Sequence, residues 1–186
     1  MAVADVVSEK AGTSWNIDRA HSHVEFAVRH LMISTVKGRF AEVSGTVRSD
    51  ERDPGRGEAD IEIGVASIDT REPQRDAHLR SPDFFDAEHF PTITFKSRGI
   101  GGMTDGTFTL AGDLTIRGVT REVALHVTSE GRGKDPWGGE RAGFSATTTI
   151  RRSDFGLTWN QLLETGGVAV GDDVRISIDV ELVKAN

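Results

Sequence analysis

Hydrophobic and polar residues alternate with a period of two through most of the chain, which predicts half-buried β-strands rather than helices. The pattern recurs in eight segments, at residues 24–28, 40–47, 59–65, 93–96, 108–116, 123–127, 142–150 and 174–182. In the 40–47 segment the alternation shifts by one residue, which indicates a β-bulge. We therefore expect about eight strands, each with one apolar face.

The connections between these segments are of two kinds. Short turn sequences, such as DPGRG at 53–57, GGMTDG at 101–106 and RGVT at 117–120, predict antiparallel neighbours. Two longer connections, residues 71–91 and 153–172, contain the helix-like pieces QRDAHL and WNQLL. Connections of that length in a compact domain are usually functional.

A single all-β domain of this kind closes most economically into an antiparallel barrel, because closure removes exposed strand edges. We expect the barrel to span residues 14–184 after a mobile tail at 1–13. An eight-stranded interior holds either packed side chains or one slim ligand, and the residues alone leave both open. Small residues with inward parity would leave room in it, namely Gly45, Gly112, Ala142 and Ala146.

Charge and composition exclude several classes of function. The 186 residues include 22 Lys and Arg against 29 Asp and Glu, a net charge of -7, so nucleic acid is an unsuitable partner. The absence of cysteine excludes disulfides and thiolate metal sites. The opening MAVADVVSEK has no basic leader region, and no apolar run is long enough to span a bilayer. We expect a cytoplasmic protein that does not span the membrane.

Three of the six histidines lie in WNIDRAHSHVEFAVRH, residues 15–30. His21 and His23 share one side of an extended strand, whereas His30 has the opposite parity. A zinc site would need further ligands from elsewhere, with His78, His89, His126 and Asp76 as candidates. In the alternative interpretation, HSH forms a strand-entry turn with a bulge at 20–22 that turns Phe26 and Val28 inward. No nucleophile or phosphate-binding motif is present, so we expect no enzyme.

Five ordered blocks of the sequence resemble the YceI-like, polyisoprenoid-binding family over about residues 14–183. The blocks are WNIDRAHSHVEFAVRHLMISTVKGRF, SIDTREPQRDAHLRSPDFFDAEHFPTITFKS, LAGDLTIRGVTREVAL, FSATTTIRRSDFGLTWN and VGDDVRISIDVEL. The resemblance implies an eight-stranded antiparallel lipocalin-like β-barrel with short helices in its two long connections. It also implies an apolar channel for a lipid-like chain, such as a polyprenyl compound or an isoprenoid quinone, and a homodimer.

The function expected from this resemblance is storage, transport or sequestration of such an amphiphile. No cofactor is expected to be required, and a polyprenyl or quinone lipid could co-purify with the protein. The alternative is a metal-binding protein or metalloenzyme that uses His21 and His23. The residues expected to line the channel are Trp15, Ile17, Phe26, Val28, His30, Phe40, Ile61, Ile63, Leu79, Phe84, Phe85, Ile93, Phe95, Phe108, Leu110, Leu114, Phe144, Ala146, Trp159, Ile176 and Ile178. The expected head-group contacts are Arg75, Asp76, His78, Asn160 and Gln161. The 74–85 stretch is expected to form a lid or a plug at the channel mouth.

Overall fold

The structure, a computed structural model, describes residues 12–186, and almost all of its regular elements are β-strands. The strands are β1 (Thr13–Ile17), β2 (His23–His30), β3 (Ser34–Phe40), β4 (Val43–Ser49), β5 (Glu58–Gly64), β6 (Ile68–Asp69), β7 (Thr92–Thr104), β8 (Thr107–Ile116), β9 (Val119–Lys134), β10 (Glu140–Arg151) and β11 (Val170–Lys184). Within residues 12–186 the helical elements are one α-helix, α1 (Pro73–Arg80), and three 3-10 turns, η1 (Pro54–Arg56), η2 (Val65–Ser67) and η3 (Arg152–Phe155).

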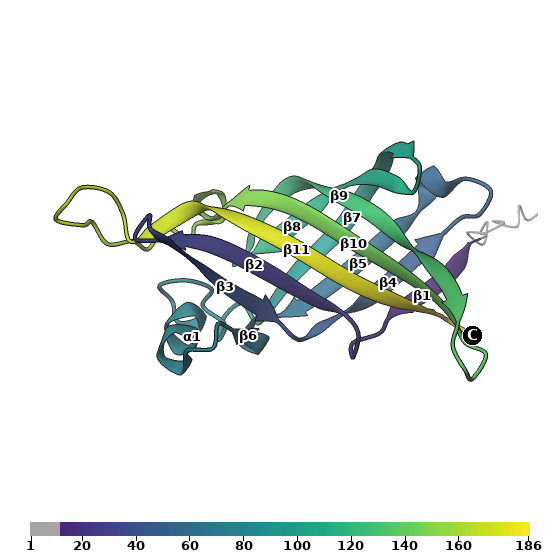
Figure 1. Ribbon diagram of the computed structural model, residues 1–186, viewed down its shortest axis with the longest axis horizontal. Coiled ribbons are helices and arrows are strands. Elements are labelled where there is room, and N and C mark those ends of the chain that lie inside the picture. The colour runs from purple at the N-terminus through teal and green to yellow at the C-terminus, as the bar shows by residue number, and fades with distance from the viewer. Residues whose placement is uncertain (1–11) are drawn as a thin grey trace, which may run out of the picture.

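Eight of the strands close into an antiparallel barrel in the order β1, β4, β5, β7, β8, β9, β10, β11 (Figure 1). The ring closes where β1 pairs with β11, with Trp15 opposite Lys184 and Ile17 opposite Leu182. Closure leaves these strands without a free hydrogen-bonding edge along the ring. The all-β, eight-stranded, antiparallel barrel predicted from the alternating pattern is therefore confirmed.

The remaining strands extend the sheet at one end of the barrel. Strand β11 pairs with β1 near its C-terminal end and with β2 along the rest of its length. Strand β2 in turn pairs with β3, and the end of β3 pairs with β6. The shift in the 40–47 segment is therefore a break between two strands and not a bulge within one, because β3 pairs with β2 whereas β4 pairs with β5. The barrel wall at this end includes β2 and β3 in place of β1 (Figure 1).

The HSH sequence lies in the break between β1 and β2 rather than in a bulge of one continuous strand. Asp18 accepts hydrogen bonds from the backbone of Ala20 at 2.9 Å and from the His21 ring at 2.9 Å. The hydroxyl of Ser22 accepts a hydrogen bond from the Glu181 backbone at 3.0 Å. This turn lets β1 and β2 pair with β11 one after the other along its length. The expected strand-entry turn is therefore present without the expected bulge.

Helical structure is found in both long connections, but only one of the two predicted pieces is helical. Helix α1 contains the predicted QRDAHL and begins after Glu72, whose carboxylate accepts from the backbone of Gln74 and Arg75. WNQLL is not helical, because Leu162 pairs with Val168 in an isolated bridge across a glycine turn. Five residues are too few to hold a helix against such pairing. The second connection instead begins with the 3-10 turn η3.

The expected tail at 1–13 falls mostly outside the described residues, and Thr13 already opens β1. Most of the buried apolar side chains of residues 12–186 form one cluster, which includes Trp15, Phe40, Phe95, Phe155 and Leu182. Among residues 12–186, no helix has the length and apolar character needed to cross a membrane.

Candidate functional site

The barrel encloses a cavity of about 1040 Å³. Its wall consists mainly of the inward-facing side chains of the barrel strands, as in β11, where Val174, Ile176, Ile178, Val180 and Leu182 alternate with outward polar residues. Close-packed interiors contain few voids larger than a water molecule, so a cavity of this size is an architectural feature rather than a packing defect. The interior is therefore hollow, which the sequence pattern alone left open.

All of the residues expected to line the channel do line this cavity, with the exception of Trp15. They are Ile17, Phe26, Val28, His30, Phe40, Ile61, Ile63, Leu79, Phe84, Phe85, Ile93, Phe95, Phe108, Leu110, Leu114, Phe144, Ala146, Trp159, Ile176 and Ile178. Of the expected head-group residues, Arg75, His78 and Gln161 are in the lining. Contact of any of these side chains with a ligand stays a prediction.

Three expected residues lie outside the cavity lining, each because a local partner holds its side chain elsewhere. Trp15 is 3% exposed, and its indole N–H donates to the Ser49 hydroxyl at 3.0 Å. Asp76 of α1 accepts from both the backbone and the hydroxyl of Thr70. The Asn160 amide bonds to the backbone N–H and C=O of Val170, as a neighbouring strand would.

The small residues expected to leave room have a different role at three of the four positions, and only Ala146 lines the cavity. A Cβ at Gly112 would lie 2.4 Å from the Phe95 ring, which covers this glycine. A Cβ at Gly45 would lie 2.2 Å from the backbone oxygen of Asp60, so β4 and β5 approach too closely for a side chain. Ala142 is buried in the core cluster. Parity alone does not distinguish an inward glycine beside a void from one beneath an aromatic ring.

Aromatic side chains crowd the end of the cavity next to α1. The His78 ring packs edge-on against Phe84 at 5.1 Å and Trp159 at 4.8 Å between ring centroids, and Phe40 packs edge-on against Phe85 at 5.7 Å. The segment is anchored to the barrel, because Arg117 donates to the backbone oxygen of Phe84 at 2.9 Å. The 74–85 stretch therefore forms part of the wall at this mouth. Its opening as a lid stays a prediction.

Arg152 is a lining residue that the sequence analysis missed. Its side chain is 8% exposed, and it donates to four backbone oxygens: those of Leu157 at 2.7 Å, Trp159 at 2.8 Å, Gly171 at 2.8 Å and Val170 at 3.2 Å. Burial lowers the pKa of this guanidinium, and the nearby Asp172 carboxylate opposes that effect. The inward parity of Ile150 extends to residue 152 and was the available signal.

Charged residues divide between the two ends of the cavity. At the α1 end, the ionisable residues in the lining are basic, namely Arg29, His30, Arg75, His78 and Arg152. The acidic residues of the described lining are Asp50 and Glu51 of the β4–β5 connection and Glu58, the first residue of β5, all at the other end. The cavity therefore has one cationic mouth and one mouth of mixed charge.

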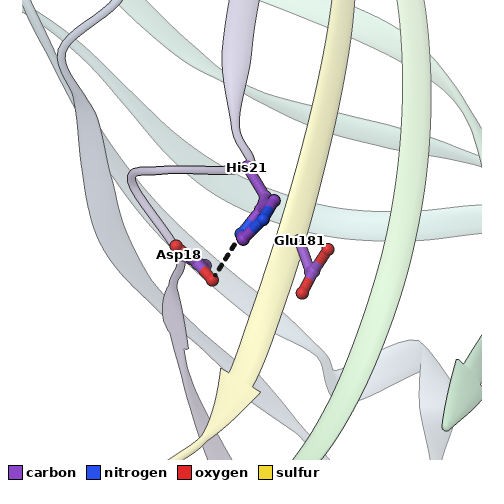
Figure 2. A group of neighbouring side chains, drawn as sticks. All are labelled: Asp18, His21 and Glu181. Atoms are coloured by element: carbon purple, nitrogen blue, oxygen red, sulfur yellow. Dashed lines mark hydrogen bonds and ion pairs between the residues drawn. The ribbon is translucent and has the colours of Figure 1, made fainter. Parts of the chain in front are cut away.

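A separate cluster of titratable groups lies outside the cavity, where Asp18, His21 and Glu181 have ligand atoms within 4.8 Å of one another. Figure 2 shows the His21 ring facing Asp18, with Glu181 on the neighbouring strand β11. The guanidinium of Arg141 donates to Asp18 at 2.7 Å and also to Glu181. The Arg141 guanidinium is therefore the positive charge that these two carboxylates face. His23 lies apart from this group, with its ring 3.5 Å from Asp179, so His21 and His23 do not form one site.

We expect this cluster to make the free energy of unfolding depend on pH. Hydrogen bonds from His21 and Arg141 lower the pKa of Asp18 from 3.8 to about 2. Because the folded-state pKa is depressed, the contribution of Asp18 is complete above pH 3.8 and is lost as the pH falls toward 2. We expect Asp18→Asn to lower the free energy of unfolding at neutral pH by about 1 to 2 kcal/mol and to differ much less from wild type near pH 2.

Urea unfolding of both proteins across this acid range measures the difference. Asp60→Asn is the control, because the Asp60 side chain is 61% exposed and pairs with Lys96 on the barrel surface at 3.5 Å. A difference between wild type and Asp18→Asn that does not change with pH would contradict the assignment.

Comparison with known proteins supports the family indicated by the sequence blocks. A profile of the YceI-like domain matches residues 15–182. The UPF0312 protein SA2479 of Staphylococcus aureus strain N315 is 39% identical over 170 residues, which covers 91% of this chain and 96% of that protein.

Solved structures share the barrel. Burkholderia cenocepacia BcnA superposes with a TM-score of 0.77 at 27% identity and covers 89% of this chain and 98% of its own. The Campylobacter jejuni YCEI protein gives a TM-score of 0.72 at 32% identity, covering 85% and 90%. A polyisoprenoid-binding domain from Saccharophagus degradans, at a TM-score of 0.66, 16% identity and coverage of 92% and 98%, shares the fold alone. By its profile match, its staphylococcal relative and its barrel, this chain belongs to the YceI-like family.

Proposed function

We propose that this protein binds one long-chain amphiphile of the polyisoprenoid or isoprenoid-quinone class inside the barrel and stores, carries or sequesters it. The observation that carries the proposal is the cavity of about 1040 Å³ with its apolar strand-lined wall. Ligand sites are usually clefts of roughly 300 to 1,000 Å³ with a few placed polar groups, so this volume suits a long ligand. The family resemblance supplies the isoprenoid class.

The chemistry of the wall supports a hydrocarbon occupant. An ionised group placed among Ile61, Leu110 and Ile178 would lose its hydration without a partner, whereas a methylene there gains about 0.8 kcal/mol. About ten buried methylenes therefore contribute on the order of 8 kcal/mol, before ordering costs of 4 kcal/mol or more. Chain length is expected to determine the affinity, and a single head-group hydrogen bond of ~1 kcal/mol to determine the orientation.

The positions of the perturbed ionisable groups favour binding over catalysis. Asp18, His21, Asp135 and Arg141 have shifted pKa values because they pair with one another, and none of them lines the cavity. Arg152 has a lowered pKa and does line the cavity, but its guanidinium is held by four backbone oxygens. A general acid or base would have to reach a substrate inside the cavity. The metal-binding alternative is not favoured, because Arg141 donates to two of the three candidate ligands.

Organic extraction of untagged, purified protein followed by mass spectrometry tests the proposal. We expect about one equivalent of a long-chain lipid per chain, or saturable uptake of a fluorescent decaprenyl probe by protein that has been stripped of lipid. Protein that yields no such lipid in repeated preparations and takes up no probe would refute the binding role. The cytoplasmic location and the homodimer stay predictions.

A further inference from the structure

Two loops form an exposed apolar tip beside the cationic mouth of the cavity. The tip consists of the exposed side chains Met32, Ile33 and Leu162, at 54%, 78% and 83% exposure. Met32 and Ile33 belong to the β2–β3 turn, and Leu162 belongs to the connection before β11. The two loops are joined, because the backbone N–H of Leu31 donates to Ala169 at 2.8 Å. Figure 1 shows both loops at the same end of the barrel as α1.

The backbone of the β2–β3 turn is unusual for the residues that it carries. Leu31 and Met32 have left-handed φ values of 51° and 60°. The turns of the β7–β8 and β8–β9 hairpins have the same successive left-handed residues, but they place Gly106 and Gly118 second. Left-handed backbone is unfavourable for large side chains and common for glycine. The β2–β3 turn therefore holds bulky apolar side chains in solvent at a conformational cost, which points to a use for them outside the fold.

The tip is continuous with the interior of the barrel. Leu31 and Leu163, the chain neighbours of Met32 and Leu162, line the cavity, as does Ala169 where the two loops join. An apolar path thus runs from the exposed tip into the cavity. A ligand that leaves a hydrocarbon phase at the tip would enter the barrel without its chain crossing water.

The charges around this mouth select the partner. Arg29 and Arg75 line it with side chains that are not buried, whereas the acidic lining residues are at the opposite mouth. Glu164 is the carboxylate of the Leu162 loop itself, so attraction to an anionic surface has to come from the arginines. In a chain of net charge -7, this division makes the tip end the more favourable one to approach such a surface.

We propose that the tip formed by Met32, Ile33 and Leu162 docks this barrel on the surface of an anionic lipid bilayer, with the cationic mouth facing the membrane. The three side chains enter the boundary between head groups and acyl chains, and Arg29 and Arg75 lie at the level of the phosphates. This proposal rests on the proposed lipid-binding function and adds the route by which the ligand is exchanged.

Vesicle flotation of the full chain tests the docking, with phosphatidylcholine vesicles that contain about one third phosphatidylglycerol. We expect wild-type protein to float and the triple variant Met32→Ser, Ile33→Ser, Leu162→Ser to bind at least about tenfold more weakly. The control is Trp137→Ser, which removes a larger side chain of 87% exposure from the β9–β10 hairpin at the opposite end of the barrel (Figure 1). This control is expected to float like wild type.

Several outcomes would overturn the docking proposal. They are a wild-type protein that stays with the soluble fraction, a triple variant that floats equally, and a Trp137→Ser variant that loses binding to the same degree. A triple variant that changes the sedimentation coefficient from dimer to monomer without a change in flotation would assign the tip to a second copy of the chain instead.

A second measurement separates this result from failure of the binding function. None of the three tip side chains lines the cavity, so uptake of a decaprenyl probe from dilute ethanol is expected to be the same in wild type and triple variant. Transfer of the same probe from donor vesicles is expected to slow in parallel with flotation. A wild-type protein that takes up no probe from ethanol would refute lipid binding. Wild type and triple variant that take the probe from vesicles at equal rates would refute docking alone.

Discussion

Replacement of Ala146 by tryptophan is expected to weaken binding of a decaprenyl probe by about 100-fold. Ala146 lies midway along β10, lines the cavity and is 7% exposed. An indole at this position fills the channel between the two mouths and shortens the hydrocarbon chain that fits. Exclusion of about four methylenes at ~0.8 kcal/mol each removes ~3 kcal/mol of binding free energy, which is about 100-fold in the dissociation constant.

A geranyl probe distinguishes shortening of the channel from general damage, because its chain fits in one half of the barrel. Its affinity for Ala146→Trp is expected to stay within a few fold of wild type. Thr149→Trp is the matched control, since Thr149 is exposed on the same strand and lies outside the lining. Fluorescence titration of both probes makes the comparison. Equal losses of affinity for the long and short probes would contradict the tunnel geometry.

The alternation of apolar and polar residues is sufficient to predict which side chains form the barrel wall, because the parity of each strand position determines which face it occupies. In β11, inward Ile176 and Ile178 must alternate with outward polar residues in any register that buries an apolar face. The same parity placed Phe26, Val28 and His30 correctly in the lining. Whether these side chains meet at the centre or leave a void depends on how widely the strands are spaced. That spacing results from closure of the whole sheet and has no local signal.

Errors arose where hydrogen bonds between distant segments outweighed local preference. WNQLL has apolar residues at helical spacing, yet its backbone pairs with residues 167–169. Asp76 was a reasonable head-group candidate on a helix, but Thr70 supplies two donors to its carboxylate. The charge division between the mouths was likewise not predictable. It depends on which connections, far apart in the chain, lie together at each end of the barrel.

Replacement of Arg152 by methionine is expected to lower the free energy of unfolding by about 3 kcal/mol or more. The Arg152 side chain joins the start of the second long connection to its end, since it donates to Leu157 and Trp159 on one side and to Val170 and Gly171 on the other. Methionine fills similar space but donates nothing. Carbonyl oxygens in a buried site each cost about 1 to 3 kcal/mol when they lose their donor, although water entering from the mouth offsets part of that loss.

Urea denaturation of three variants separates the hydrogen bonds of Arg152 from its charge. Arg151→Met removes a guanidinium from the adjacent position, where the side chain is 65% exposed and pairs with Asp172 at 3.0 Å, and it is expected to cost less than about 1 kcal/mol. Arg152→Lys keeps the charge without the planar fork, so it cannot reach carbonyls on both sides, and its stability is expected to lie between wild type and Arg152→Met. Faster hydrogen exchange at residues 157–170 is expected only in the Arg152 variants. An Arg152→Met protein as stable as Arg151→Met would show that this connection is held by the packing of Phe155 and Leu157 instead, because these are the side chains of the same segment that are buried in the core cluster.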